Sequence, residues 1–386
     1  MNLALVISSL EGGGAERVMS VLANAWAEAG DVVTLITLAP ARADKYVLGS
    51  TVRRIELGVT VRSNNVPQAL LHNLTRVRAV RRALRLCRPD VAISFVTRTN
   101  VLTLLASIGL QIPVVVSERT FVPSERWMNG FWGRLYRPLY GRAEAVVVQT
   151  QRSADAMERA LGRAVTVIPN PLSDAPANAT GGTSHLNLAA APCHRRRVLL
   201  AAGRLSPEKG FEDLIDAFAR IAKRYPRWDL KIVGEGMLRG VLGARIARHG
   251  LESRVSVPGF DPDVRATMRR SDLFVLSSRF EGFPNVLLEA MAEGMACVSF
   301  DCEAGPRELI KHGENGWLVP PRNVAALAAA LATAMGDDAL RARIGARARS
   351  VRSLYSPQRV IGQWNALLRS LAPMVIGERP LGGDAQ

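Results

Sequence analysis

The sequence predicts an α/β protein with two domains, each built on a parallel β-sheet. The chain has 386 residues, more than one ordinary domain. In both halves, short runs rich in Val and Ile alternate with amphipathic segments. A polar stretch rich in Pro and Gly, residues 173–195, separates the halves and indicates a linker. We therefore expect two sheets, each covered by helices, that face each other across a cleft.

The first half contains six apolar runs that we expect to be strands. They are residues 3–8, 32–38, 90–96, 113–117, 143–149 and 164–169. Helices are expected from about Ala15 and over the amphipathic segments 67–87 and 151–161. The uncharged stretch 99–117 approaches the length of a membrane span. Gly109 and Pro113 divide it into a helix and a strand, so a span is not expected.

The second half repeats the alternation. Its expected strands are residues 197–203, 229–236, 254–260, 272–278, 296–300 and 316–320. Residues 322–371 look wholly helical, and the tail looks loose after about residue 373. The predicted organisation is an N-terminal domain, a linker, a C-terminal domain, a helix that can pack back on the N-terminal domain, and a tail. Their ranges are 1–172, 173–195, 196–355, 356–372 and 373–386.

Composition limits the function classes. The formal net charge is +16, and basic residues outnumber acidic ones in both halves, so polyanionic partners are favoured. A nucleic acid is not expected, because no nucleic-acid-binding module is recognisable. Four cysteines without CxxC or metal-site spacing suggest reduced thiols of a cytosolic protein; they are Cys87, Cys193, Cys297 and Cys302. The N-terminus lacks a basic region and reads as a strand rather than a signal peptide.

Glycine-rich turns follow two of the expected strands. In SSLEGGGAER, residues 8–17, Gly13 and Gly14 precede a helix whose free N–H groups favour an anion. The motif lacks the GxGxxG spacing of a dinucleotide site, and a purely structural turn is an equally good interpretation. Gly234 and Gly236, in VGEGMLRG, form a second pair, for which a simple tight turn is the better reading of the motif alone.

Two cations lie in the loop GRLSPEKGF, residues 203–211. Arg204 and Lys209 are five residues apart and flank the start of a helix. A diphosphate could be neutralised here without a metal, by the fork of an arginine and the point charge of a lysine. The alternative is a solvated turn, which would be the better interpretation of an isolated Arg-x4-Lys pair. The position of the loop at the carboxyl end of a strand weakens that alternative.

Two acids surround a Gly-Phe-Pro-Asn turn in RFEGFPNVLLEAMAEG, residues 279–294. Pro284 suits the first position of a helix. Helical periodicity then places Asn285 and Glu289 away from an inward face formed by Leu287, Ala290, Met291 and Gly294. Amides of residues 282–285 could hold a phosphate. Glu289 could accept hydrogen bonds from a ribose, and Glu281 from a sugar beyond the phosphates. The alternative is a surface ion pair at each acid.

Four segments together resemble the nucleotide-sugar-dependent retaining glycosyltransferases of family 4, which have the GT-B fold. They are GGGAER, GRLSPEKGF, GEG and EGFPNVLLEAMAEGMACVSFDCEAGPRELI, in the family's order and spanning most of the chain to about residue 320. SERTFVP at 117–123, followed by AEAVVVQT, is similar to bacterial enzymes that build capsule, exopolysaccharide and lipid-linked oligosaccharides.

The resemblance implies roles for individual residues. Arg204 and Lys209 would neutralise the donor's diphosphate, Glu289 would bind the ribose, and Glu281 would bind the transferred sugar. The other donor-binding residues it implies are Gly13, Gly14, Gly234, Gly236, Gly282, Phe283, Pro284 and Asn285. Glu118 and Arg119 would lie on the acceptor side, where many relatives carry a His, so their role is less defined.

The resemblance also implies the chemistry. No metal or other cofactor is expected, and Asp261-Pro-Asp263 reads as an ordinary turn. Retention would follow from attack on the same face, with the leaving phosphate taking the acceptor's proton. The expected partners are a nucleotide-sugar donor, probably UDP-linked, and a lipid-linked or polysaccharide acceptor. A non-catalytic nucleotide- or sugar-phosphate-binding protein of the same architecture is the main alternative. A phosphorylase is remote, because no lysine has the context of a cofactor attachment site.

Contact with an anionic membrane is a further expectation. Segment 126–142 places aromatic residues among arginines; the aromatic residues are Trp127, Phe131, Trp132, Tyr136 and Tyr140. Segment 75–88 adds six arginines at helical spacing. The alternative is a helix whose aromatic residues pack on the sheet and whose arginines are solvated. The predicted location is the cytoplasmic face of a membrane, with peripheral attachment.

Overall fold

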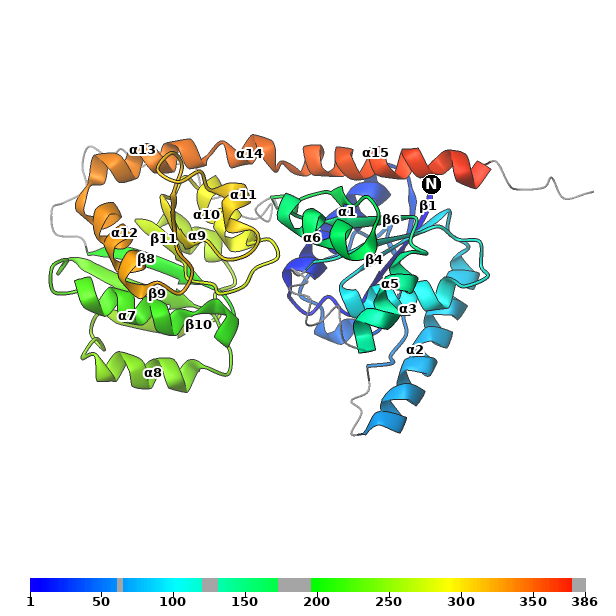
Figure 1. Ribbon diagram of the computed structural model, residues 1–386, viewed down its shortest axis with the longest axis horizontal. Helices are drawn as coiled ribbons and strands as arrows, with labels where there is room; N and C mark the ends of the chain where they lie inside the picture. The colour runs from blue at the N-terminus through cyan, green and yellow to red at the C-terminus, as the bar shows by residue number, and fades with distance from the viewer. Residues whose placement is uncertain (61–64, 120–130, 173–195, 377–386) are drawn as a thin grey trace, which may run out of the picture. The chain divides into compact units, whose positions relative to one another are not determined.

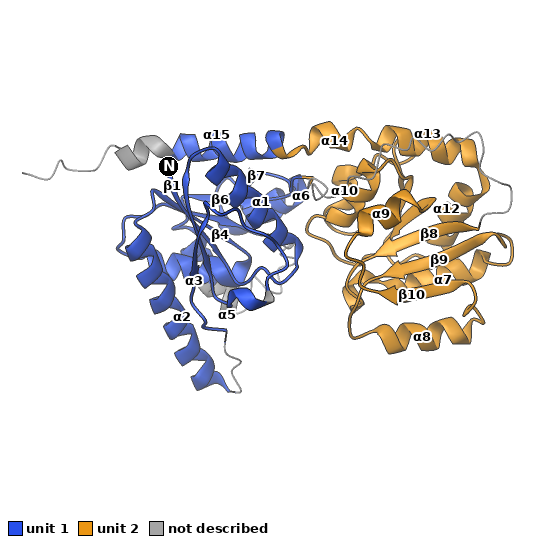
Figure 2. Ribbon diagram, turned by 180° about the vertical axis from the view of Figure 1, so that it is seen from behind, with its two compact units in different colours: residues 1–171, 358–386 blue, residues 172–357 orange. Residues whose placement is uncertain are grey.

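A computed structural model describes residues 1–60, 65–119, 131–172 and 196–376. The chain divides into two compact units (Figure 2). Unit 1 consists of residues 1–171 and 358–386, and unit 2 of residues 172–357. The predicted linker, 173–195, lies outside the described residues, as do the side chains of residues 43, 131–135 and 372–376. Each unit is a layered α/β structure and is described by itself.

Unit 1 contains a seven-stranded parallel sheet in the order β3-β2-β1-β4-β5-β6-β7 (Figure 1). The strands are β1 (Asn2–Ile7), β2 (Val32–Thr37), β3 (Arg53–Glu56), β4 (Val91–Phe95), β5 (Val114–Ser117), β6 (Ala145–Val148) and β7 (Thr166–Val167). The helices are α1 (Gly14–Glu28), α2 (Val66–Cys87), α3 (Thr97–Ser107), α5 (Phe131–Tyr140), α6 (Gln151–Leu161) and α15 (Pro357–Ile376), with a 3₁₀ turn η1 (Ala41–Ala43). All six strands expected in this half are present. β3 was not predicted, because its sequence RRIE is charged and only partly buried.

Strand alternation gives unit 1 two apolar cores. Leu3 and Leu5 of β1 point to the side covered by α1 and α15, whereas Ala4 and Val6 point to the side covered by α2, α3, α5 and α6. Trp364 of α15 meets Trp26 of α1 edge to face, with ring centroids 6.3 Å apart. The last helix of the chain is therefore part of the first unit's core.

Unit 2 contains a six-stranded parallel sheet in the order β10-β9-β8-β11-β12-β13. The strands are β8 (Arg197–Ala202), β9 (Trp228–Val233), β10 (Val255–Gly259), β11 (Leu273–Leu276), β12 (Cys297–Phe300) and β13 (Trp317–Val319). The helices are α7 (Phe211–Ile221), α8 (Arg239–Arg248), α9 (Val264–Arg269), α10 (Asn285–Ala292), α11 (Pro306–Leu309), α12 (Val324–Gly336), α13 (Asp338–Ala348) and α14 (Val351–Leu354), with a 3₁₀ turn η3 (Pro207–Lys209).

The six strands expected in the second half are all present, and parallel as predicted. Residues 322–371 are mainly helical, as expected, but short breaks separate α12 to α15. The tail was expected to begin at about residue 373, and α15 ends close to that point, at Ile376. Leu371, near the end of this helix, packs in the unit 1 core.

The uncharged stretch 99–117 forms most of α3 and the whole of β5, so its predicted division is confirmed. Within the described residues, the structure contains no helix that combines the length and the apolar character needed to cross a bilayer.

In both sheets the first strand of the unit lies inside the sheet, and the later strands are added first on one side of it and then on the other. In unit 1, β2 and β4 flank β1; in unit 2, β9 and β11 flank β8. Such a reversal leaves a crevice at the carboxyl ends of the strands, where ligands of open α/β sheets bind. The loops that leave β8, β9 and β11 are therefore the first place to look for a site in unit 2.

Candidate active site

The loops after β8 and β9 interlock at the carboxyl edge of the unit 2 sheet. The Leu205 N–H donates to the Glu235 carbonyl (2.8 Å), and the Leu238 N–H donates to the Leu205 carbonyl (3.1 Å). Gly234 has φ +146°, and a Cβ there would lie 1.9 Å from the Gly203 carbonyl oxygen. Glycine is needed here for packing between two backbones. Contact of Gly234 or Gly236 with a donor stays a prediction.

Lys209 and Glu281, which lie in two different loops, form an ion pair. Lys209 Nζ lies 2.7 Å from Glu281 Oε1, and both side chains are largely buried, with 21% and 10% exposed. The loops that carry them are bonded to each other, since Ser277 Oγ donates to the Lys209 carbonyl (2.9 Å). Gly210, with φ +60°, lets the Lys209 loop pack against the backbone of Ser277. A Cβ at this position would lie 2.3 Å from the Ser277 carbonyl oxygen. A cation and an acid thus meet at the end of β11.

A further ion pair holds these loops in register, and sequence reasoning missed it. Arg279 Nη2 lies 3.0 Å from Asp213 Oδ2 in the first turn of α7. Arg279 Nη1 also donates to the Pro207 carbonyl (3.2 Å), and its N–H donates to the Glu208 carbonyl (2.8 Å). Arg279 therefore ties the β11 loop to η3 and α7. The partners are sixty-six residues apart in sequence, so nothing local indicates the pair.

Arg204 is exposed, and among the described residues it forms no ion pair with Glu281. Burial alone would raise the pKa of Glu208, but the hydrogen bond from Ser206 and the charges of Lys209 and Arg204 hold that pKa below its usual value. Glu208 thus offsets part of the positive charge of this loop. The assignment of Arg204 to a diphosphate stays a prediction.

The helix after the acidic turn differs from the prediction in two ways. Pro284 is the N-cap of α10, and the helix begins at Asn285 instead of at Pro284. Residues 287–292 are all buried, and Glu289 is only 4% exposed, so the expected exposure of Glu289 was wrong, whereas Asn285 is half-buried. The cause is tertiary, because α9, α13 and α14 surround this short helix. A role for Glu289 in holding a ribose stays a prediction.

The turn at 282–285 is also less open than expected. The Asn285 N–H donates to the Phe283 carbonyl (3.0 Å), so this amide is engaged within the turn. Phe283 is buried, and its ring lies 5.7 Å from the ring of Tyr355. Gly305, with φ +94°, packs on Pro284, where a Cβ would lie 2.5 Å from Pro284 Cδ. The loop after β12 therefore supports the turn, and donor contact by Gly282 and its neighbours stays a prediction.

In unit 1, the glycine loop after β1 leads into α1 as predicted. Gly13 is the N-cap and Gly14 the first helical residue. The Tyr46 hydroxyl donates to the Gly13 carbonyl (3.1 Å). The Glu16 carboxylate folds over the loop, where a Cβ on Gly13 would lie 2.1 Å from Glu16 Oε2. An anion at this helix end would have to displace that carboxylate, so phosphate contact by Gly13 and Gly14 stays a prediction.

Glu118, at the end of β5, is the centre of a buried polar network. Its carboxylate accepts hydrogen bonds from Thr97 Oγ1 (2.6 Å), from Asn100 Nδ2 (3.2 Å) and from the Tyr136 and Tyr140 hydroxyls. Burial raises the pKa of Glu118 even though these four donors act to lower it. The network joins β5, α3 and α5, so Glu118 has a clear structural role; its predicted contact with an acceptor is untested.

Arg119 is also enclosed, with 8% of the residue exposed. Its guanidinium lies over the Phe95 ring, 3.6 Å from the centroid, and Nη1 donates to Asn170 Oδ1 (2.6 Å). Burial lowers the pKa of Arg119, and the Glu118 charge opposes this. The two residues are neighbours in sequence, yet they face different surroundings.

Two of the aromatic residues assigned to a membrane contact do not face outward. Tyr136 is 1% and Tyr140 0% exposed, and both bond to Glu118. Their rings stack with centroids 3.7 Å apart. For these two residues the alternative is correct: their rings pack inward, and each hydroxyl donates to the Glu118 carboxylate. Trp127 lies outside the described residues, as do the side chains of Phe131 and Trp132.

Asp261 and Asp263 satisfy backbone and hydroxyl donors in the turn before α9. Asp263 Oδ1 caps α9 by accepting from the Ala266 N–H (3.0 Å), and Asp261 Oδ2 accepts from Thr267 Oγ1 (2.6 Å). This agrees with reading the triplet as an ordinary turn. In the part of the chain that the structure describes, Cys297 and Cys302 are buried free thiols and Cys87 is half-buried.

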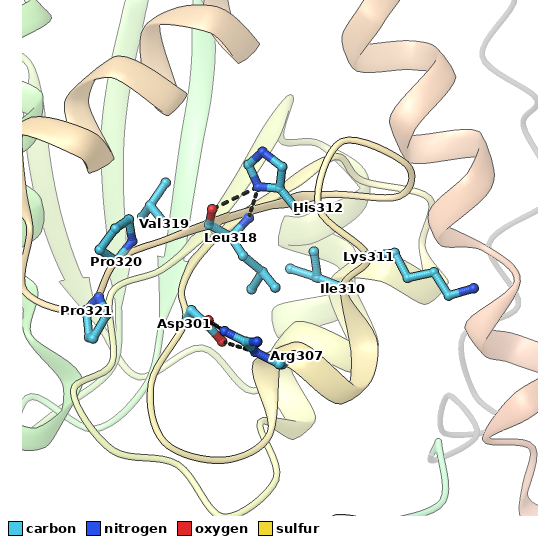
Figure 3. A pocket seen from close by; sticks show the side chains of 9 residues that line it. All are labelled: Asp301, Arg307, Ile310, Lys311, His312, Leu318, Val319, Pro320 and Pro321. Atoms are coloured by element: carbon cyan, nitrogen blue, oxygen red, sulfur yellow. Dashed lines mark hydrogen bonds and ion pairs between the residues drawn. The ribbon is translucent and has the colours of Figure 1, made fainter.

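A pocket of about 690 Å³ opens beside β12 and β13, and it contains none of the residues proposed from the sequence (Figure 3). It is lined by Asp301, Arg307, Ile310, Lys311, His312, Leu318, Val319, Pro320 and Pro321. Arg307 is paired with Asp301, and His312 Nδ1 accepts from the Leu318 N–H (3.1 Å). Its polar groups are thus largely engaged with one another, and the chemistry of the Lys209–Glu281 pair lies elsewhere in unit 2.

Two family profiles match the chain. The profile of the family described as "Glycosyl transferases group 1" matches residues 191–351, and that of the "Glycosyl transferase 4-like domain" matches residues 13–171. The first covers the Lys209–Glu281 pair and the acidic turn, and the second covers the glycine loop and Glu118.

Individual proteins are similar over most of the chain. An exopolysaccharide phosphotransferase of Streptomyces coelicolor is 32% identical over 76% of this chain, which spans only 30% of that protein. An undecaprenol-linked glycan α-1,4-N-acetyl-D-galactosaminyltransferase of Campylobacter jejuni is 26% identical over 88% of this chain and 90% of its own length. The Anabaena protein HepE, solved with UDP, has a TM-score of 0.76 at 24% identity, covering 96% of this chain and all of that one.

Proposed function

We propose that this chain, which belongs to the family-4-like glycosyltransferases of the GT-B fold, moves a sugar from a UDP-linked donor to a lipid-linked or polysaccharide acceptor with retention of anomeric configuration. The observation that carries the proposal is the Lys209–Glu281 ion pair at the carboxyl edge of the unit 2 sheet. A cation and a hydroxyl-accepting acid at this edge suit the two ends of a sugar diphosphate.

The pair suggests how the donor is bound. A diphosphate offers Lys209 a stronger anionic partner than one carboxylate, so the lysine exchanges Glu281 for phosphate when the donor enters. Glu281, released from the lysine, then accepts hydrogen bonds from sugar hydroxyls. The Arg279–Asp213 pair keeps both side chains at the same place during this exchange. Arg204, exposed at the mouth of the loop, adds a second cation for the diphosphate.

Retention requires that the acceptor oxygen attack from the face that the diphosphate leaves. The bond from the acceptor oxygen to the anomeric carbon forms, the bond from that carbon to the phosphate oxygen breaks, and the acceptor proton passes to the leaving phosphate. This step needs no separate general base and no metal, since Lys209 and Arg204 stabilise the departing charge. Activity that persists in a chelator is the expected result.

The acceptor side is inferred from the relatives. The Campylobacter relative acts on an undecaprenol-linked glycan, and an acceptor of this kind would bring the protein to the cytoplasmic face of a membrane. The Streptomyces relative is named as a phosphotransferase. Because this chain spans under a third of that protein, we favour glycosyl transfer, and the mass of the product distinguishes the two reactions.

A donor screen tests the proposal. The purified chain is incubated with UDP- and GDP-sugars and a membrane lipid extract, and nucleotide release and product mass are measured. We expect UDP release with one donor, loss of release in Glu281→Gln and Lys209→Ala, and normal release in Glu252→Gln and Lys223→Ala, which change exposed residues away from the pair. UDP binding without release from any donor would instead indicate a non-catalytic nucleotide-binding protein.

A further inference from the structure

The cavity beside β12 and β13 lies at the same edge of the unit 2 sheet as the Lys209–Glu281 pair. We call this cavity, whose nine lining residues are drawn in Figure 3, the β13 pocket. Asp301 follows the last residue of β12, and Pro320 follows the last residue of β13. Both strands lie beyond β11 in the order β8-β11-β12-β13. Since neighbouring strands are about 5 Å apart, the pocket begins close to the loop that carries Glu281.

Electrostatics supports this nearness. Cys302, next to Asp301 in the chain, is buried. Burial, followed by the charge of Glu281, raises the pKa of the Cys302 thiol to about 12, and the charge of Lys209 opposes the rise. Charges shift the pKa of a group when they lie close to it. The β13 pocket is therefore a neighbour of the Lys209–Glu281 pair, although neither residue lines it.

Side-chain hydrogen bonds fix the wall of the pocket that carries Lys311 and His312. Asn315 Oδ1 accepts from the Lys311 N–H (2.8 Å), and Asn315 Nδ2 donates to the Leu309 carbonyl (3.1 Å). The Leu318 N–H donates to His312 Nδ1 (3.1 Å). These bonds lie within the protein, so the wall is held without help from a ligand. A preformed wall lowers the entropy cost of binding.

Three basic side chains of the pocket keep hydrogen-bonding capacity. Asp301 accepts from Arg307 Nε (3.1 Å) and from Nη2, which leaves Arg307 Nη1. His312 Nδ1 is occupied by the backbone of Leu318, and Figure 3 shows the other ring nitrogen, Nε2, turned away from that backbone. Arg307 Nη1, Lys311 Nζ and His312 Nε2 form no hydrogen bond or ion pair with any residue that the structure describes.

The lining suits one negative charge on a body that has both hydroxyl groups and C–H surface. Arg307 and Lys311 carry two positive charges and Asp301 one negative charge, which gives +1 with His312 counted as neutral. Each Asp301 oxygen keeps a lone pair for a hydroxyl donor. The volume of about 690 Å³ is that of a small-molecule site. The remaining lining residues are apolar: Ile310, Leu318, Val319, Pro320 and Pro321.

We propose that the β13 pocket binds an acidic sugar, either a uronate or a sugar phosphate. Lys311 and Arg307 Nη1 contact the anionic group, His312 Nε2 and Asp301 contact hydroxyls, and the apolar wall packs on ring C–H groups. Such a sugar has two sources. It is a unit of the acceptor glycan, in which case the inference rests on the proposed function, or it is a free metabolite, which does not require that function.

Saturation-transfer NMR on the full chain with excess UDP tests the site. UDP fills the proposed donor site, so the remaining signal reports on other sites. The probes are glucuronate, glucose 6-phosphate and glucose. We expect both acidic sugars to bind at least about tenfold more tightly than glucose, because charge-assisted hydrogen bonds are lost with the neutral sugar. Equal affinity for glucose and glucuronate would overturn the assignment to an acidic sugar.

A double variant tests the location. Lys311→Gln, His312→Asn removes the ammonium group and Nε2, while the asparagine oxygen can still accept from the Leu318 N–H. This variant should bind glucuronate at least about tenfold more weakly and bind UDP normally. Lys223→Gln, His72→Asn makes the same changes outside the pocket and should bind both like the unchanged chain. Equal weakening of glucuronate binding by the two double variants would overturn the assignment to the β13 pocket.

Turnover distinguishes the two sources. If the sugar belongs to the acceptor, the pocket variant raises KM for a uronate-containing oligosaccharide acceptor and leaves KM for a neutral one unchanged. If it is a free metabolite, added glucuronate changes the rate with a neutral acceptor in the unchanged chain but not in the variant. A chain that releases UDP from a donor but binds no acidic sugar overturns this inference and leaves the proposed function standing. Acidic-sugar binding without turnover of any donor has the reverse meaning.

Discussion

Glu118 in unit 1 and Glu281 in unit 2 follow parallel strands at the carboxyl edges of their sheets, yet their surroundings differ. Glu118 is enclosed, and its partners are hydroxyl and amide groups, with burial raising its pKa. Glu281 is also largely buried, but its partner is the ammonium group of Lys209 at 2.7 Å. The first acid is held by neutral donors from two helices, α3 and α5, whereas the second is held by one cation, which a charged ligand could attract away.

The comparison teaches that position in the fold does not decide the role of an acid. A carboxylate surrounded by fixed neutral donors is part of the interior, because removing it leaves those donors unsatisfied. A carboxylate paired with one mobile cation can exchange its partner for a charged ligand. We therefore expect changes at Glu118 to affect stability and changes at Glu281 to affect activity.

The largest expected effect is on activity at the Lys209–Glu281 pair. Glu281→Gln should lower kcat by on the order of 10²–10³-fold, because an interaction with the reacting sugar is lost. The change in unfolding free energy should stay below about 1 kcal/mol, since glutamine has the shape of glutamate and its amide oxygen can still accept a hydrogen bond from Lys209. Steady-state kinetics measures kcat, and urea unfolding measures the unfolding free energy. A Gln variant with near-normal kcat and a large loss of stability would remove the distinction between the two acids.

The next effect is on stability at Glu118. Glu118→Ala should lower the unfolding free energy by about 3 kcal/mol, because the Thr97, Asn100 and Tyr140 donors lose their acceptor in a buried site. Urea denaturation measures the change. Ser107→Ala, at the half-buried C-terminal end of α3, is a control expected to change stability by less than about 1 kcal/mol. Equal values for the two variants would mean that the network stabilises nothing.

A smaller effect is expected from the Arg279–Asp213 pair. Asp213→Asn should lower kcat/KM by about tenfold, because the Lys209 and Glu281 loops lose a constraint on their register. Asp216→Asn is a matched control on the same helix, where the carboxylate pairs with Arg245 instead. A purely structural role would lower stability in both variants and change kinetics in neither. KM and kcat are therefore measured separately at a temperature where both variants are folded.

The smallest expected effect concerns pH. Because the pKa of Glu118 is raised above its usual value of 4.5, the folded protein holds this proton more tightly than the unfolded chain. Stability from this group is complete below pH 4.5 and falls as pH rises through the folded-state pKa. Glu118→Gln cannot titrate, so its stability relative to the unchanged chain should increase with pH, by about 1 kcal/mol for each unit of the shift. Parallel stability curves for both proteins would contradict the raised pKa.

Much of the fold was predictable from local sequence. Buried parallel strands need near-continuous apolar runs, so β1, β4 and β8 are visible as such, and the helices between them follow from periodicity. β3 was missed because a charged edge strand resembles a loop. The loops with Gly13, Lys209 and Glu281 could be found because each follows a strand and precedes a helix.

The sequence by itself determined the strand-helix alternation, the two-unit organisation and the residue types at the strand ends, since these depend on near neighbours in the chain. Tertiary structure alone decided that Lys209 meets Glu281, that Asp213 holds Arg279, that α10 is enclosed and that Glu118 lies inside. Each of these depends on groups far apart in sequence being brought within a few ångströms by packing. Burial and pairing are properties of that packing, and no local pattern specifies them.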